Sequence, residues 1–220
     1  MIKNIFKFSI KRRLKEAYVP YSKDHKAKTR AHIVETARKM FNQNGFEGVS
    51  IDAIMDRAGL TRGGFYNHFK NKEALYSEAV TSFLMGRGAK WRSDAGIDLT
   101  GLDPQMARQM IESYLSAEHL TDIDGQCPMI ALPSDVARAK DSVGQSYQVL
   151  VEAIVGLFET GLAKQSPAPR EAALSIAALC IGGMVLARTV PDALLSEDIR
   201  AAAKQTALGL TQPSSAYRKQ

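Results

Sequence analysis

Residues 59–75, "GLTRGGFYNHFKNKEAL", place three glycines and three aromatic side chains beside Arg62 and Lys72. Glycine weakens helices, so this concentration needs a chemical reason. Gly63 and Gly64 leave no side chain at the start of a short helix, and its backbone can therefore approach a phosphate group or a base edge closely. The stretch is suited to non-covalent recognition of a nucleic acid rather than to bond-making chemistry.

Eight residues of this stretch are candidates for contact with DNA. Arg62 can reach a guanine edge or a phosphate, and the hydroxyl of Thr61 suits a phosphate oxygen. Lys72, at the start of the next helix, can hold the flanking backbone. Taken singly, Tyr66 is also compatible with a core aromatic residue and His68 with an ordinary surface residue. The candidate DNA-binding residues are Thr61, Arg62, Gly63, Gly64, Tyr66, Asn67, His68 and Lys72.

Two helices are expected to flank these candidates. The first is predicted over residues 29–44, where apolar side chains recur at spacings of three and four, and Gly45 is placed to end it with a left-handed cap. The second is predicted to begin after Asn71, whose side chain can cap it.

Between them, two shorter helices are predicted. Ser50 can cap a helix over 51–58 that Gly59 stops, and Thr61 can cap a helix over 62–69. Two short helices joined by a tight glycine-containing turn form a helix-turn-helix, whose second helix can lie in the major groove of DNA. The predicted core of this unit is Ile51, Ile54, Ala58, Gly59, Leu60, Phe65 and Phe69.

Charge is spread unevenly along the 220 residues, whose net charge is +6. Residues 1–95 hold 19 Lys and Arg against 9 Asp and Glu, a balance of +10, whereas residues 96–220 hold 10 against 14, a balance of −4. The difference indicates that only the first part meets a polyanion, although a charge excess taken alone is also typical of a solvated surface.

Composition favours an all-α protein with a proper core, since 45% of the residues are hydrophobic. Cys127 and Cys180 lie far apart, which suggests neither a disulfide framework nor a metal site and makes a reduced, cytoplasmic setting the default. The most apolar stretch, 172–187, is shorter than the roughly 18 residues that span a bilayer, so no membrane association is expected. No nucleotide-binding or catalytic motif is found, so we expect no cofactor and no enzyme.

The predicted division of the chain has four parts. They are an N-terminal extension (1–25), a helix-turn-helix domain (26–86), a C-terminal helical domain (87–210) and a flexible tail (211–220). Residues 1–18 carry apolar residues at helical spacing between basic ones, and their role stays open: a membrane-surface helix, a DNA-contacting arm, a vector-derived segment or a start codon placed too early. In the latter case, Val19 lies close to the true beginning.

Four helices are predicted in the C-terminal domain. They run from Pro104 to about His119, from Asp141 to Ala163, over 172–187 and over 196–210, with a short helical stretch at Cys127 that is interrupted near Pro133. The small residues of 172–187 and the face of the helix from Asp141 are the candidate dimer interface, and a core within one chain is the alternative.

Residues 29–80 resemble the DNA-binding domain of the TetR family of bacterial regulators. The residues that carry the resemblance are Ile33, Ala37, Phe41, Gly45, Phe46, Ile54, Ala58, Gly59, Tyr66, Phe69, Lys72, Glu73 and Leu75. Met55 departs from it, because alanine is more usual there. The resemblance implies a homodimeric cytoplasmic repressor that binds double-stranded DNA at a palindromic operator. It further implies that a small molecule in the C-terminal domain changes the spacing of the two DNA-binding heads, with the helix from Asn71 as the lever.

The segment around Cys127 resembles one TetR subgroup with a Cys-Pro motif before a helix. Pro128 suits a first helical position, so Cys127 becomes the cap residue, where unpaired amides tend to lower a thiol pKa. Cys127 is therefore a candidate sensor for electrophiles or oxidants, and a buried structural cysteine is the alternative. His119 and Tyr114 are candidate effector residues together with it. A helical thiol-dependent enzyme using Cys127 is the competing function.

Overall fold

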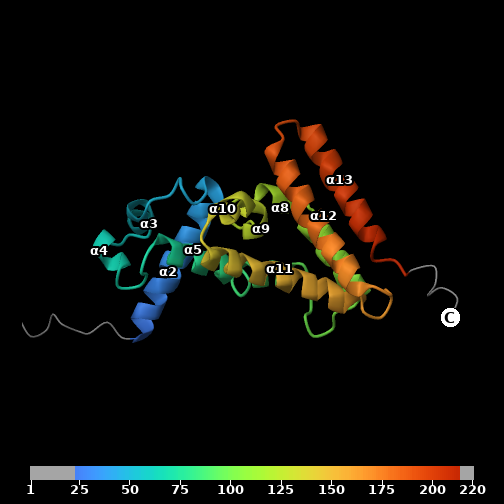
Figure 1. The fold of residues 1–220 in the computed structure, drawn as a ribbon, viewed down its shortest axis with the longest axis horizontal. Coiled ribbons are helices and arrows are strands. Elements are labelled where there is room, and N and C mark those ends of the chain that lie inside the picture. Colours follow the sequence, from blue (N-terminus) through green and yellow to red (C-terminus); the bar gives the residue numbers. More distant parts are fainter. Residues whose placement is uncertain (1–22, 214–220) are drawn as a thin grey trace, which may run out of the picture.

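The computed structural model describes residues 23–213, and within them every regular element is an α-helix (Figure 1). The helices are α2 (Lys23–Asn44), α3 (Ile51–Arg57), α4 (Arg62–Phe65), α5 (Lys72–Ser82), α6 (Arg87–Asp94), α7 (Pro104–Tyr114), α8 (Ala117–Thr121), α9 (Pro128–Ala131), α10 (Pro133–Arg138), α11 (Asp141–Leu162), α12 (Pro169–Thr189) and α13 (Ala193–Gly209). The predicted roles of 1–18 and of most of the tail lie outside the described residues.

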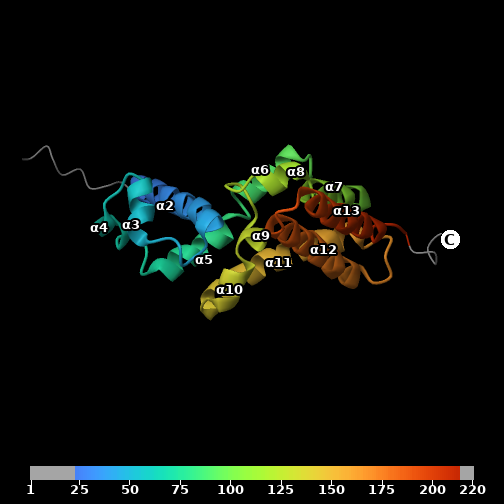
Figure 2. The ribbon, with the colours of Figure 1, turned by 90° about the horizontal axis from the view of Figure 1, so that it is seen from above.

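Helices α2 to α5 form a head at one end of the molecule (Figures 1 and 2). Two of the predicted caps are confirmed: Ser50 Oγ accepts a hydrogen bond from the amide of Ala53 at 3.1 Å, and Asn71 Oδ1 accepts one from Ala74 at 2.8 Å. Gly45 and Gly59 have φ of 71° and 69°, the left-handed region in which only glycine is unstrained.

Two details of the head differ from the expectations. Regular α-helix at α4 ends at Phe65 rather than at residue 69, and the chain continues to Phe69 in tight turns. Thr61 lies at the N-cap position but its side chain makes no capping hydrogen bond. The two glycines in this short segment explain the early end of the helix, because glycine disfavours helix propagation.

The core of the head consists of apolar side chains from all four helices. Ile33, Phe41, Ile54 and Phe65 are fully buried, and Phe41 packs edge-on against Tyr76 of α5 at 4.8 Å between ring centres. Of the predicted core, Ile54, Ala58, Phe65 and Phe69 are buried, Ile51 and Leu60 are half-buried against it, and Gly59 is the exposed turn residue.

The remaining helices form a body in which α12 packs between α11 and α13 (Figure 1). The helix from Pro104 stops at Tyr114, earlier than expected, because Ser116 caps a separate helix, α8, by accepting from His119 N. Helix α6 was not predicted. The long α11 and the break at Pro133 agree with the prediction.

The apolar helix is longer than the stretch 172–187. Within the described residues, α12 is the one helix whose length and composition could span a membrane, with a mean hydropathy of 1.7 over its most apolar window. One of its sides is buried against α11, α7 and α13, while Leu174 and Leu186 are exposed on the other. The buried side of α12 agrees with the core alternative, and the dimer interface stays a prediction. Helix α11 mainly packs inside the chain, on α12 and α5.

Candidate DNA-binding surface and effector site

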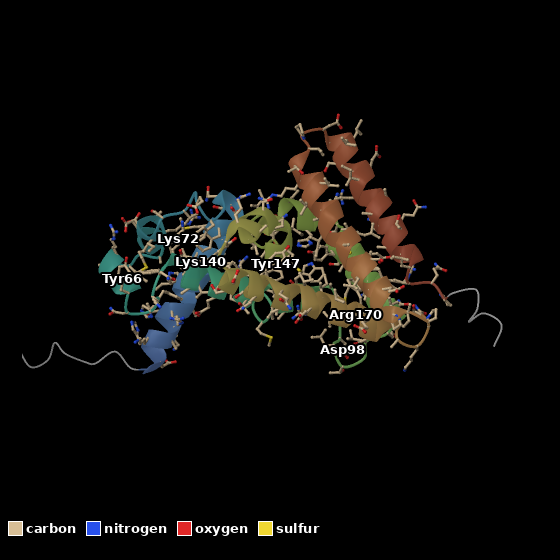
Figure 3. All side chains as sticks on the ribbon, viewed as in Figure 1. Tyr66, Lys72, Asp98, Lys140, Tyr147 and Arg170 are labelled. Atoms are coloured by element: carbon tan, nitrogen blue, oxygen red, sulfur yellow. The ribbon has the colours of Figure 1, made fainter. Side chains whose placement is uncertain are left out.

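The candidate DNA-binding residues gather at the tip of the head. Tyr66 follows α4 at the end of the molecule farthest from α13, and its side chain is 59% exposed (Figure 3). Thr61, Arg62, Gly63 and Asn67 are also exposed. A large exposed aromatic residue is unusual on a small helical head whose other aromatic side chains pack inward, so Tyr66 is available to a partner.

Arg62 is held by an acidic neighbour. Its Nη1 donates to Asp52 Oδ2 of α3 at 2.9 Å, and the two side chains are 68% and 56% exposed. Pairs this exposed contribute only about 0–1 kcal/mol, so Arg62 can exchange Asp52 for a phosphate or a base at little cost.

Three of the candidates are less accessible. Gly64 is half-buried, and so is His68, whose Nδ1 is buried without a hydrogen-bond partner and whose pKa is lowered by burial and by Lys26 and Arg30. Lys72 lies with its ammonium 4.1 Å from the ring centre of Phe46. The side chain of His68 is therefore neutral and partly buried against the rest of the head.

The fold does not require the two glycines of α4. A Cβ at Gly63 would meet no atom within 4 Å, one at Gly64 would make only ordinary contacts with Thr61 and Met55, and neither residue has positive φ. Glycine in a helix costs about 0.5–1 kcal/mol relative to alanine. The head therefore carries a stability cost that its own packing does not explain.

A hollow of about 430 Å³ borders α4 on the side of α2. Lys26 and Thr29 of α2 line it together with Thr61, Gly64 and Asn67. The first turns of α2 thus extend the exposed polar surface beyond α4.

Cys127, Tyr114 and His119 lie together in the body. All three line or border a small apolar cavity, and the rings of Tyr114 and His119 pack edge-to-face at 4.8 Å. The sequence-predicted effector residues thus share one site. Met110 also lines it, whereas Phe158 and Met184 belong to the core.

The expected low pKa of Cys127 is wrong. The thiol is 1% exposed, and burial raises its pKa to about 11. Helix α9 has four residues, too few for its amides to outweigh the loss of hydration. Cys180 is also buried, with its pKa raised to about 12.

His119 is neutral and its tautomer is defined. Burial is the main cause that lowers its pKa, and its Nδ1 lies 2.8 Å from the carbonyl oxygen of Tyr114. Because a carbonyl only accepts, Nδ1 carries the proton and Nε2 keeps a free lone pair.

A loop beside this site holds the head to the body. Asn42 of α2 donates from Nδ2 to the carbonyl of Gln126 at 2.8 Å, and Arg38 Nη1 donates to the carbonyl of Asp124 at 2.8 Å. Arg188 of α12 donates to the side-chain oxygen of Gln126 and to the carbonyl of Asn42. We call Arg38, Asn42, Gln126 and Arg188 the polar latch. Sequence reasoning missed it, because its partners come from three distant segments.

Helix α5 connects the same two regions. Near its start, Lys140 at the beginning of α11 donates to Glu73, and Ser77 Oγ donates to the carbonyl of Ser142, both at 2.9 Å. Just past its end, Phe83 lines the cavity. Among the described residues no cluster of three or more His, Cys, Asp or Glu could hold a metal ion.

This geometry, an exposed short helix after a glycine turn on a small head of four helices, defines a helix-turn-helix DNA-binding domain. Residues 33–79 match the family model described as "Bacterial regulatory proteins, tetR family". Residues 33–79 therefore form a DNA-binding domain of the TetR type.

Curated relatives match mainly over the head. The chain is 42% identical over 57 residues to the HTH-type transcriptional regulator AcrR of Shigella flexneri, covering 26% of each chain. It is 43% identical over 51 residues to the probable acrEF/envCD operon repressor of Escherichia coli K12, covering 23% of each. It is 27% identical over 110 residues to the repressor KstR2 of Rhodococcus jostii, covering half of each. The match to the first two thus spans about a quarter of their length.

Solved structures extend the likeness to the whole fold. Reduced E. coli NemR superposes with a TM-score of 0.67 at 18% identity, covering 81% of this chain and 96% of that one. A transcriptional regulator from Pseudomonas aeruginosa PAO1 superposes with a TM-score of 0.62 at 23% identity, covering 91% and 98%. The three relatives are named as regulators or repressors, and none of these proteins supports the thiol-dependent enzyme. The Cys-Pro subgroup stays a prediction.

Proposed function

We propose that the protein is a homodimeric transcriptional repressor that binds a palindromic operator through α4 and leaves it when a small molecule occupies the body. The observation that carries this proposal is the exposed surface of Tyr66, Arg62 and the side-chain-free Gly63 at the tip of the head. Because the structural neighbours are less than 25% identical, they support the fold and not the ligand or the operator.

DNA contact follows from the exposed groups. Gly63 lets the backbone approach the duplex, Arg62 offers a guanidinium to a base edge or a phosphate, and Tyr66 offers a ring and a hydroxyl. Lys72 is the candidate for the flanking backbone, where it would leave the ring of Phe46. Because His68 is partly buried, it contributes less to DNA contact than Tyr66 does.

A second copy of the chain is the occupant we propose for the outer face of α12 and α13. Leu186 and Leu194 are 56% and 79% exposed there, and Leu174 and Leu195 extend the apolar surface. Two-fold symmetry places one such patch against itself and gives two heads for two half-sites. Burial of this face in the dimer would explain why α12 is apolar without requiring that it cross a membrane. The proposed protein is accordingly cytoplasmic and bound to the nucleoid.

The effector region we propose is the cavity bordered by Tyr114, His119 and Cys127. It lies between Phe83, just past the end of α5, and the loop 122–127, which carries Gln126 of the polar latch. A ligand that binds one arrangement of these elements better than another shifts the spacing of the heads. Burial of Cys127 favours a non-covalent ligand over an electrophile or oxidant.

The test compares binding to operator and random duplexes by fluorescence anisotropy at fixed salt. Tyr66→Ala and Arg62→Met should weaken operator binding by about 10-fold or more and random-duplex binding much less. Lys72→Met should weaken both alike and reduce the salt dependence. Lys164→Met, an exposed lysine in the body, is the control. Equal losses on both duplexes for Tyr66→Ala and Arg62→Met would contradict their role in sequence reading.

The dimer is tested by sedimentation. Leu194→Glu should give monomers that lose most operator affinity, whereas Met85→Glu, at a site 86% exposed in the α5–α6 connection, should not. A Leu194→Glu protein that stays dimeric would move the interface elsewhere.

A further inference from the structure

Two neighbouring hollows in the body share one wall. An apolar cavity of about 50 Å³ is lined by Met110, Tyr114 and Cys127 among others, and a cleft of about 560 Å³ lies next to it. Trp91 and His119 line both, together with Phe83. The ring of Trp91 lies 5.7 Å from His119 and 6.0 Å from Tyr114, so its side chain is part of the wall between the two spaces.

The wall carries two polar groups without a charge. The hydroxyl of Tyr114 is completely buried, the thiol of Cys127 is its one hydrogen-bonding neighbour among the described residues, and burial keeps its pKa well above the usual value. His119 is neutral, with Nδ1 bonded to the Tyr114 carbonyl and Nε2 left as an acceptor. Because sulfur is a weak acceptor, this buried hydroxyl loses hydrogen-bond free energy that a bound oxygen acceptor would recover.

Most charged groups near the two spaces already make a hydrogen bond or an ion pair. Arg92, which borders the cavity, donates to the carbonyl of Leu84 at 2.8 Å, and the cavity surface is almost entirely carbon. In the cleft, Asp122 pairs with Arg87, and Asp94 pairs with Lys90 at 2.9 Å. Glu118 also lines the cleft, where it is exposed to water and makes no ion pair among the described residues. A net charge on a ligand would therefore lose hydration without gaining an unpaired counter-charge in the cavity.

We propose that the cavity and the cleft form a single binding site for a small uncharged amphiphile, an apolar ring or chain bearing one hydroxyl or carbonyl group. A benzene ring needs a cavity of roughly 150 Å³, so such a ligand displaces Trp91 and joins the two spaces. Its polar group meets the Tyr114 hydroxyl and His119 Nε2. The binding site does not depend on the proposed function, and only the role of the ligand as an effector rests on it.

Trp91 is the single tryptophan of the chain, so its fluorescence reports on this wall alone. The full-length protein is titrated without DNA with benzyl alcohol, benzylammonium and benzoate, which share a ring and differ in charge. Benzyl alcohol should change the emission saturably, with a dissociation constant in roughly the millimolar range. The two ions should bind at least about 10-fold more weakly.

Three variants locate the ligand. Tyr114→Phe should weaken benzyl alcohol about 5- to 10-fold and leave toluene unchanged. Ala153→Leu, which fills the cavity, should abolish the response to both, and the exposed Ala163→Leu is the matched control. Circular dichroism confirms that each variant is folded.

Each failure has a separate meaning. Equal binding of either ion overturns the uncharged class, and an unaltered response in Ala153→Leu overturns the site. No response of Trp91 to benzyl alcohol, in a protein that still binds operator DNA, overturns this inference and leaves the proposed repressor intact.

Discussion

The guanidinium of Arg188, near the end of α12, donates a hydrogen bond to the backbone carbonyl of Asn42 in the last turn of α2 at 3.1 Å. Asn42 in turn donates to the carbonyl of Gln126, whose own side-chain oxygen accepts from Arg188. Asn42 and Gln126 are 2% and 0% exposed. The head and the body therefore meet through a buried polar contact rather than through a hinge open to water, and the loop that carries Gln126 borders the proposed ligand site.

Arg188→Met should destabilise the protein and loosen the head. It leaves the buried oxygen of Gln126 and the carbonyl of Asn42 without a donor, at a cost of about 1–3 kcal/mol. At this chain length, each kcal/mol lowers the melting temperature by roughly 2–4 °C. Thermal unfolding measures the loss, and hydrogen exchange should accelerate at the end of α2. Arg170→Met, which removes an exposed pair with Glu159, is the control and should change little. Equal melting temperatures for the two variants would mean that the polar latch does not couple head and body.

Gly63→Ala should stabilise the protein and weaken its function. The added methyl group meets open space and raises helix propensity, so the free energy of unfolding should increase by about 0.5–1 kcal/mol. Operator affinity should fall about 10-fold or more, because the methyl group lies where the duplex approaches. Gly156→Ala in α11 is the control, because its added methyl group also meets open space. It should raise the free energy of unfolding without lowering operator affinity. Full operator affinity in Gly63→Ala would remove the proposed reason for the glycine.

Stability should fall as the pH is lowered through the ordinary range of histidine. The pKa of His119 is lowered in the fold, so between that pKa and 6.5 the unfolded chain binds a proton that the native protein does not. His68 acts in the same direction. Urea unfolding between pH 7.5 and about 5 should show this decline, and His119→Asn, which keeps a donor for the Tyr114 carbonyl, should reduce the slope. An unchanged slope in the variant would place the titration elsewhere.

Neither cysteine should react in the native protein. With a pKa of about 11, Cys127 is thiolate in roughly one molecule in 10⁴ at pH 7, and Cys180 in fewer. Labelling with a thiol reagent should be slow before unfolding and should count both thiols after it. Fast native labelling of Cys127 would restore the sensor hypothesis.

The head could be predicted from sequence because its signals are local. Ser50 and Asn71 are caps, Gly45 and Gly59 occupy left-handed turns, and the apolar spacing of α2 defines a face. The effector site was only partly predictable, since Cys127 was identified from the proline beside it while its burial depends on helices far along the chain. Trp91 and the polar latch carry no local signal, and the low pKa expected for Cys127 failed because burial outweighed the cap.

The most direct test of the central claim is selection of duplexes by the full-length protein from a random pool at physiological salt, followed by sequencing. The repressor account predicts an enriched palindrome with two half-sites about one helical turn apart, bound by a dimer and lost in Tyr66→Ala. A pool that remains random after repeated rounds, with folded dimeric protein, would contradict it.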